Sequence, residues 1–94
     1  MSDRELLEAA ARAAGVELIV IDGALYFKDM GLGNEFNPLV DDAQAFRLAV
    51  KLGMHCVDAF PVPSMALIKE CDGDEYAATR RAIVRAAAQL GEEQ

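Results

Sequence analysis

The sequence predicts an α+β protein: a three-layer α/β/α sandwich with a mainly antiparallel four-stranded sheet between its helices. The first observation is a rough duplication, in which a helical stretch ending at Gly15 and another ending at Gly53 each lead into two short apolar runs. The second is a further helical stretch, Glu75–Leu90, which completes the order αββ–αββ–α. The third is that the runs carry apolar residues on both faces, so both faces of the sheet need a cover.

The first helix is expected to begin at a capping box, Ser2–Glu5, and to end at Gly15, which can adopt the left-handed conformation. Two β-prone runs follow, Val16–Ile21 and Ala24–Phe27. The Asp-Gly pair between them is a signal for a two-residue turn, so these runs are expected to form a β-hairpin.

The second helix is expected to begin at Asp41, which has a Gln three positions later, as in a capping box. It follows an irregular stretch, Gly31–Pro38, which contains two glycines. The helix is expected to bury Ala45, Phe46, Ala49, Val50 and Leu52. Gln44, Arg47 and Lys51 share its opposite side.

The second pair of strands is expected at Met54–Phe60 and Met65–Ile68, separated by the proline-containing segment Pro61–Ser64. The last helix then follows, capped by Asp72 or Asp74.

Composition limits the classes of function. The chain has 94 residues, which predicts a single domain spanning 1–94, and its 53% apolar content excludes intrinsic disorder. Its net charge of −7 argues against nucleic-acid binding and against docking on an anionic membrane. The acidic N-terminal residues do not form a signal peptide and no apolar run is long enough to span a membrane, so we expect a cytoplasmic protein with reduced cysteines.

Three stretches carry a resemblance to a known family: Asn37–Asp42, Phe46–Gly53 and Ala78–Ala87. Together with the opening helix and the Asp-Gly turn, they resemble the phage α/β/α sandwich domain, a family of small bacteriophage and prophage proteins. The resemblance implies the same three-layer fold and a phage or prophage origin, hence the cytoplasm of a bacterial host. It implies no particular activity.

The residue types needed for metal binding or nucleophilic catalysis are few. His55, Cys56 and Cys71 are the soft ligands, and no pair has the spacing of a zinc site. His55 and Cys56 are neighbours in a predicted strand, so their side chains are expected on opposite faces. The glycines of 31–33 lack the Lys-Ser/Thr of a phosphate loop. We therefore predict no metal, no cofactor and no catalytic residue.

The irregular stretch supplies the first candidate contact surface, formed by Asn34, Glu35, Phe36 and Asn37. An aromatic residue in a polar segment is a typical interface anchor. The alternative is that Phe36 folds back as a lid on the core, which we favour because small domains need apolar area.

Arg80 is the second candidate, because it lies on the apolar stripe of the last helix, among Tyr76, Ile83, Val84 and Ala87. A guanidinium there needs a carboxylate or several carbonyls. We favour a structural ion pair, with Asp41, Asp42 and Asp58 as the candidate partners. The alternative is an anion-binding site.

These observations favour a small phage-encoded accessory protein that acts through protein–protein interaction. The alternative is a small-ligand binder or an enzyme that uses the Gly31–Pro38 loop and Arg80. Mimicry of nucleic acid ranks last, because the carboxylates are spread evenly. Apolar surface that the short helices leave uncovered predicts weak self-association.

Overall fold

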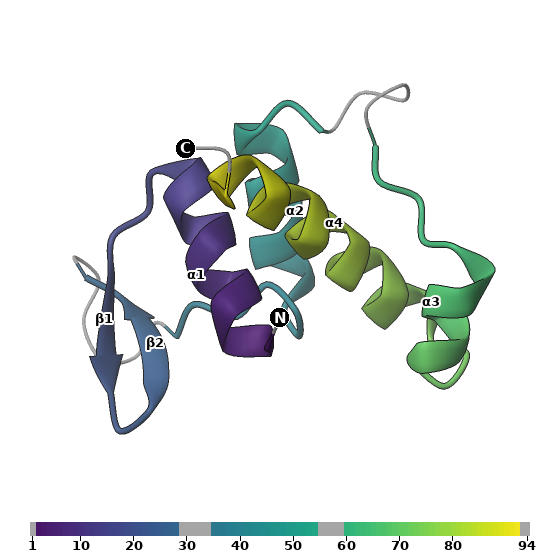
Figure 1. Ribbon diagram of the computed structural model, residues 1–94, viewed down its shortest axis with the longest axis horizontal. Helices are drawn as coiled ribbons and strands as arrows, with labels where there is room; N and C mark the ends of the chain where they lie inside the picture. The colour runs from purple at the N-terminus through teal and green to yellow at the C-terminus, as the bar shows by residue number, and fades with distance from the viewer. Residues whose placement is uncertain (1, 29–34, 55–59, 93–94) are drawn as a thin grey trace.

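The computed structural model describes residues 2–28, 35–54 and 60–92 (Figure 1). Within these ranges the protein is a small α+β fold of four helices and one two-stranded antiparallel sheet. In chain order its elements are α1 (Asp3–Ala14), β1 (Leu18–Ile21), β2 (Ala24–Phe27), α2 (Asp42–Lys51), α3 (Met65–Glu70) and α4 (Glu75–Glu92).

The predicted three-layer sandwich with a four-stranded sheet is wrong. The run Met65–Ile68, predicted as a strand, lies in α3. The reason is local: the Ser64 hydroxyl accepts a hydrogen bond from the backbone N–H of Leu67 at 3.2 Å, and Met, Ala, Leu, Lys and Glu all favour helix. The other predicted strand, Met54–Phe60, has residues 55–59 outside the described part of the chain.

The predicted hairpin is confirmed. β1 and β2 pair antiparallel, with Leu18 opposite Phe27 and Ile21 opposite Ala24. Asp22 and Gly23 both have positive φ, 51° and 83°, which matches a two-residue turn whose twist suits a hairpin. The ribbon lies beside α1 (Figure 1) and buries Leu25 from β2.

Helix α4 organises the core, because it contacts α1, α2 and α3. It lies alongside α1 in Figure 1, and the two helices run in the same direction, since Asp3 pairs with Arg81 and Ala9 lies against Gly91. The contact is built from small residues: Ala9, Ala10, Ala87, Ala88 and Gly91 are all almost fully buried. Small side chains allow two helix backbones to approach closely.

The predicted helix caps are confirmed at three helices. Ser2 and Glu5 form the reciprocal capping box of α1. The Asp41 carboxylate accepts from the backbone N–H of Gln44 at the start of α2, and Asp74 does the same for Ala77 at the start of α4. The Gly15 backbone is left-handed, with φ of 70°, and ends α1 as expected.

The predicted buried face of α2 is partly wrong. Ala45 and Ala49 are buried as expected, and so is Leu48, but Phe46 and Val50 are 65% and 41% exposed. The prediction assumed a four-stranded sheet on which this helix would pack. Since the described part of the chain has only the hairpin, α2 packs on the core through Ala45, Leu48 and Ala49 and leaves Phe46 and Val50 largely in solvent.

Candidate functional site

An apolar hollow of about 330 Å³ lies between α2 and α4, and we call it the α2–α4 groove. Its lining residues come from both helices and from the segment that precedes α3: Asp42, Ala45, Phe46, Ala49, Phe60, Tyr76, Thr79, Arg80 and Ile83. The alanines form its floor because they are the residues through which α2 approaches the core.

Large aromatic side chains stand at the margins of the groove. Phe46 projects from α2 and Tyr76 from α4, where it is 76% exposed. Phe60 adds a third, partly exposed aromatic side chain. Three aromatic rings around one apolar hollow are unusual on a surface that solvent alone covers, and aromatic residues are enriched where proteins bind proteins.

The charged residues that line the groove pair with each other. The Arg80 Nη1 atom lies 2.6 Å from Asp42 Oδ1, and its Nε donates to the carbonyl of Leu39 at 2.8 Å. The Arg80 side chain is only 18% exposed, whereas that of Asp42 is 74% exposed. Arg80 thus ties α4 to the start of α2 and to the segment before it.

Arg80 therefore sits where the sequence placed it, against the body of the protein, and Asp42 is one of the three candidate partners. Asp41 is used as the α2 cap, and Asp58 lies outside the described residues. Two of the guanidinium's donors are already occupied, which weakens the alternative of an anion site there. Tyr76, predicted on the same buried stripe, is exposed instead.

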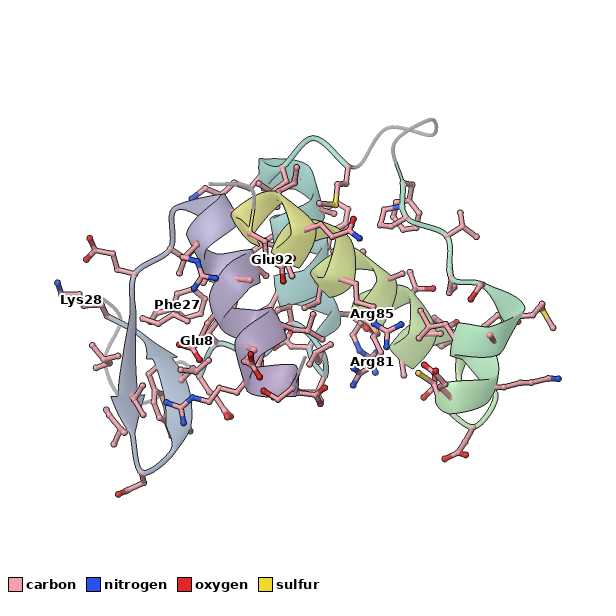
Figure 2. All side chains as sticks on the ribbon, in the orientation of Figure 1. Glu8, Phe27, Lys28, Arg81, Arg85 and Glu92 are labelled. Carbon is pink, nitrogen blue, oxygen red and sulfur yellow. The ribbon has the colours of Figure 1, made fainter. Side chains whose placement is uncertain are left out.

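Sequence reasoning did not identify a role for Arg81 or Arg85, the two other arginines of α4. Arg81 makes a bidentate pair with Asp3, at 3.0 and 3.2 Å, and Arg85 lies 3.6 Å from Glu70 of α3. Figure 2 shows the two arginines next to each other on α4. No local spacing signals the Arg81–Asp3 pair, because its members are 78 positions apart.

These contacts change the acidity of the paired groups. The hydrogen bonds from Arg81 lower the pKa of Asp3 from its ordinary value of 3.8. The same hydrogen bonds raise the pKa of Arg81. Both shifts favour the charged forms, so the pair joins the beginning of α1 to the middle of α4 at neutral pH.

The predicted contact surface at 34–37 is only partly described. Phe36 is 4% exposed and meets Phe27 edge-to-face, with ring centroids 5.4 Å apart, so it forms a lid on the core. Glu35 is exposed, and the Gln44 side chain holds this segment by donating to the Glu35 carbonyl and accepting from the Asn37 N–H, both at 2.8 Å. Asn34 lies outside the described residues.

The candidate metal ligands give no site in the part of the chain that the structure describes. Cys71 is a free thiol at the end of α3, while His55 and Cys56 fall in the range left undescribed. In the described ranges no three His, Cys, Asp or Glu residues come together in a way that could hold a metal ion. None of the helices described has the length and apolar character needed to cross a membrane.

Comparison with known proteins finds no matching family model, no matching curated protein and no matching solved structure. The resemblance to the phage domain, and the phage origin that it implies, therefore stay predictions from the sequence.

Proposed function

We propose that the protein acts by binding another protein, and that the α2–α4 groove receives an apolar helical face of that partner. The observation that carries this proposal is the exposure of Phe46 and Tyr76 on the two sides of an apolar hollow. Helix-in-groove recognition needs this combination: an apolar floor between two helices, with large side chains that close over the incoming residues.

The chemistry of the groove favours an apolar contact face on the partner. Its charged lining residues, Arg80 and Asp42, neutralise each other, so an apolar side chain that enters the groove does not strand either charge. Outside the groove the protein carries a net charge of −7. A partner with basic residues around its apolar face would be attracted over a distance and would associate faster.

The proposal also includes the origin that the family resemblance implies, a phage or prophage accessory protein. The support for this part is the resemblance of Asn37–Asp42, Phe46–Gly53 and Ala78–Ala87 to the phage domain. The groove argument is independent of that origin, because it depends only on the exposed side chains of α2 and α4.

Site-specific photo-crosslinking tests the groove. A photoreactive benzoylphenylalanine replaces Tyr76 in the full chain, expressed at low level in a bacterial host. We expect one adduct of defined mass, and we expect Phe46→Asp to abolish it, because a carboxylate at the opposite margin makes the groove unsuitable for an apolar face.

The control places the same photoreactive residue at Val20, which is 53% exposed on the hairpin. An equally strong adduct from this position would show that crosslinking does not depend on the groove, and the proposal would fail. Weak self-association is not expected to give an adduct at this low expression level, so the proposal would also fail if the adduct contained only copies of this chain.

A further inference from the structure

A second hollow of about 330 Å³ lies where the end of α1, the hairpin and α2 meet, and we call it the hairpin pocket. Its lining combines aromatic, aliphatic and basic side chains: Ala14, Val16, Phe27, Phe36, Asp41, Ala43, Gln44, Arg47, Leu48 and Lys51. None of these residues lines the α2–α4 groove, so the two sites use different faces of α2. The volume is within the range of pockets that hold small molecules.

The aromatic wall of the hairpin pocket is held in place by several bonds. Phe27 and Phe36 meet edge-to-face at an interplanar angle of 88°. The Phe36 N–H donates to the Leu25 carbonyl at 2.8 Å, and the two hydrogen bonds of the Gln44 amide fix the residues on either side of Phe36. Figure 2 shows Phe27 between the hairpin and α1. A wall restrained in this way needs little ordering when a ligand binds.

Two cationic side chains line the opening of the hairpin pocket. Arg47 and Lys51 are one helical turn apart on α2, so they share a side of the helix. All nine cationic residues of the chain lie in the described ranges, and five of them pair with described carboxylates: Arg4, Lys28, Arg80, Arg81 and Arg85. Of the four that make no such pair, two line this pocket.

The acidic residue in the lining, Asp41, offsets only one of the two positive charges of Arg47 and Lys51. The Asp41 carboxylate accepts from the N–H of Gln44 and so serves the start of α2, whereas Lys51 lies in the last turn of that helix. The hairpin pocket is thus a locally cationic site on an acidic protein, with an aromatic interior.

From this arrangement we infer that the hairpin pocket binds a small aromatic carboxylate. The ring of the ligand packs against Phe27 and Phe36, where edge and face contacts between aromatic rings are favourable. Its carboxylate accepts hydrogen bonds from Arg47 and Lys51 at the rim. The small-ligand alternative from the sequence combined the Gly31–Pro38 loop with Arg80. In the structure these residues do not share a site: Phe36 of that loop lines the hairpin pocket, whereas Arg80 lines the α2–α4 groove. The hairpin pocket is therefore the small-ligand site that we infer.

A titration of the isotope-labelled full chain with 2-naphthoate, followed by NMR, tests this inference. We expect saturable shifts of the ring signals of Phe27 and Phe36 and of the Leu48 methyl signals. The neutral analogue 2-naphthamide should bind about tenfold more weakly, because it keeps the ring and loses both charge contacts. Octanoate, which keeps the carboxylate and lacks the ring, should also bind more weakly.

The double variant Arg47→Gln/Lys51→Gln should weaken naphthoate binding by a similar factor of about ten while leaving naphthamide binding unchanged. Lys69→Gln, at an exposed cation on α3, is the matched control and should change neither. Equal binding of naphthoate and naphthamide would overturn the role of the cations, and equal binding of octanoate would overturn the aromatic class. Shifts confined to Phe46 and Tyr76 would assign the ligand to the other groove and overturn the inference.

Discussion

Gly91 is the residue at which α4 approaches the backbone of α1, and it determines how far apart these helices lie. A Cβ atom added at this position would overlap the carbonyl group of Ala9, which belongs to the backbone and cannot rotate away. In an exposed helical position, replacing Gly by Ala stabilises a protein by about 1 kcal/mol. At Gly91 the clash between an added Cβ and the Ala9 carbonyl opposes this gain in stability.

We therefore predict that Gly91→Ala destabilises the protein by about 1–3 kcal/mol, because the two helices must separate. Chemical denaturation measures the change. Gln89→Ala, at an exposed position on the same helix, is the control and should leave the stability nearly unchanged. A stabilised Gly91→Ala protein would show that α1 and α4 are not in contact there.

Arg80 acts through its charge and through its long apolar stem, and two substitutions separate these roles. We predict that Arg80→Ala lowers stability by about 1–2 kcal/mol, since it removes packing, the bond to the Leu39 carbonyl and the pair with Asp42. Arg80→Met keeps the stem and should cost less, because the exposed Asp42 carboxylate is not stranded in the interior. Thermal unfolding compares the variants, and equal losses for both would assign the whole effect to the charge.

The Asp3–Arg81 pair gives the protein a pH-dependent contribution to stability. Because the pKa of Asp3 is lowered in the folded state, its contribution is present above pH 3.8 and is lost as the pH falls below that value. We predict that the unfolding free energy of the wild type exceeds that of Asp3→Asn by about 0.5–1 kcal/mol at pH 7. This difference in stability should disappear near pH 2.

A double-mutant cycle with Arg81→Gln isolates this pair from other effects of each substitution, with unfolding free energies measured at both pH values. A difference between the wild type and Asp3→Asn that is constant with pH would contradict the ionic origin of the effect.

At the scale of the element, the described helices are set mainly by their ends. Asp41 begins α2 by accepting from the Gln44 N–H at 3.1 Å. We predict that Asp41→Ala costs about 1 kcal/mol, whereas Asp41→Asn, which keeps an acceptor oxygen, costs much less. Denaturation midpoints measure both. Equal losses would indicate that the carboxylate charge, and not its hydrogen bond, supports the helix.

Elements with a local signal could be predicted from the sequence. The Asp-Gly turn predicts the hairpin, and the acceptor residues before each helix predict where α1, α2 and α4 begin. The failure at Met65–Ile68 has a physical cause: four apolar residues fit a strand or one turn of helix equally well by periodicity. Ser64 decides between them, because its hydroxyl accepts a hydrogen bond from the backbone N–H of Leu67 and so caps α3.

The candidate sites were harder to predict than the elements. Arg80 could be singled out because a charge interrupts an apolar stripe, but the groove beside it could not. Whether Phe46 is buried depends on which element packs on α2, and that is a tertiary property with no local signature. The hairpin pocket likewise brings together Phe27, Phe36 and Lys51, whose separations in the chain follow no motif.

At the scale of the whole molecule, two opposing terms govern association. The described surface exposes large apolar side chains, and two of them, Phe46 of α2 and Tyr76 of α4, flank the α2–α4 groove. Their burial between two copies would be favourable. Each copy also carries a net charge of −7, so two copies repel. The balance between them depends on salt, because dissolved ions screen the charge repulsion between two copies and leave the hydrophobic attraction nearly unchanged.

We predict that the protein is monomeric at low ionic strength and self-associates weakly at high ionic strength, where the Debye length falls from about 30 Å at 0.01 M to about 3 Å at 1 M. Sedimentation across a range of salt and protein concentrations measures this. Phe46→Asp should abolish the association at every salt concentration, while Val20→Asp, on the hairpin, should leave it in place. A strict monomer at high salt and high concentration would show that the groove buries too little area to hold a second copy. Association that weakens with added salt would show that it depends on opposite charges instead of apolar contact.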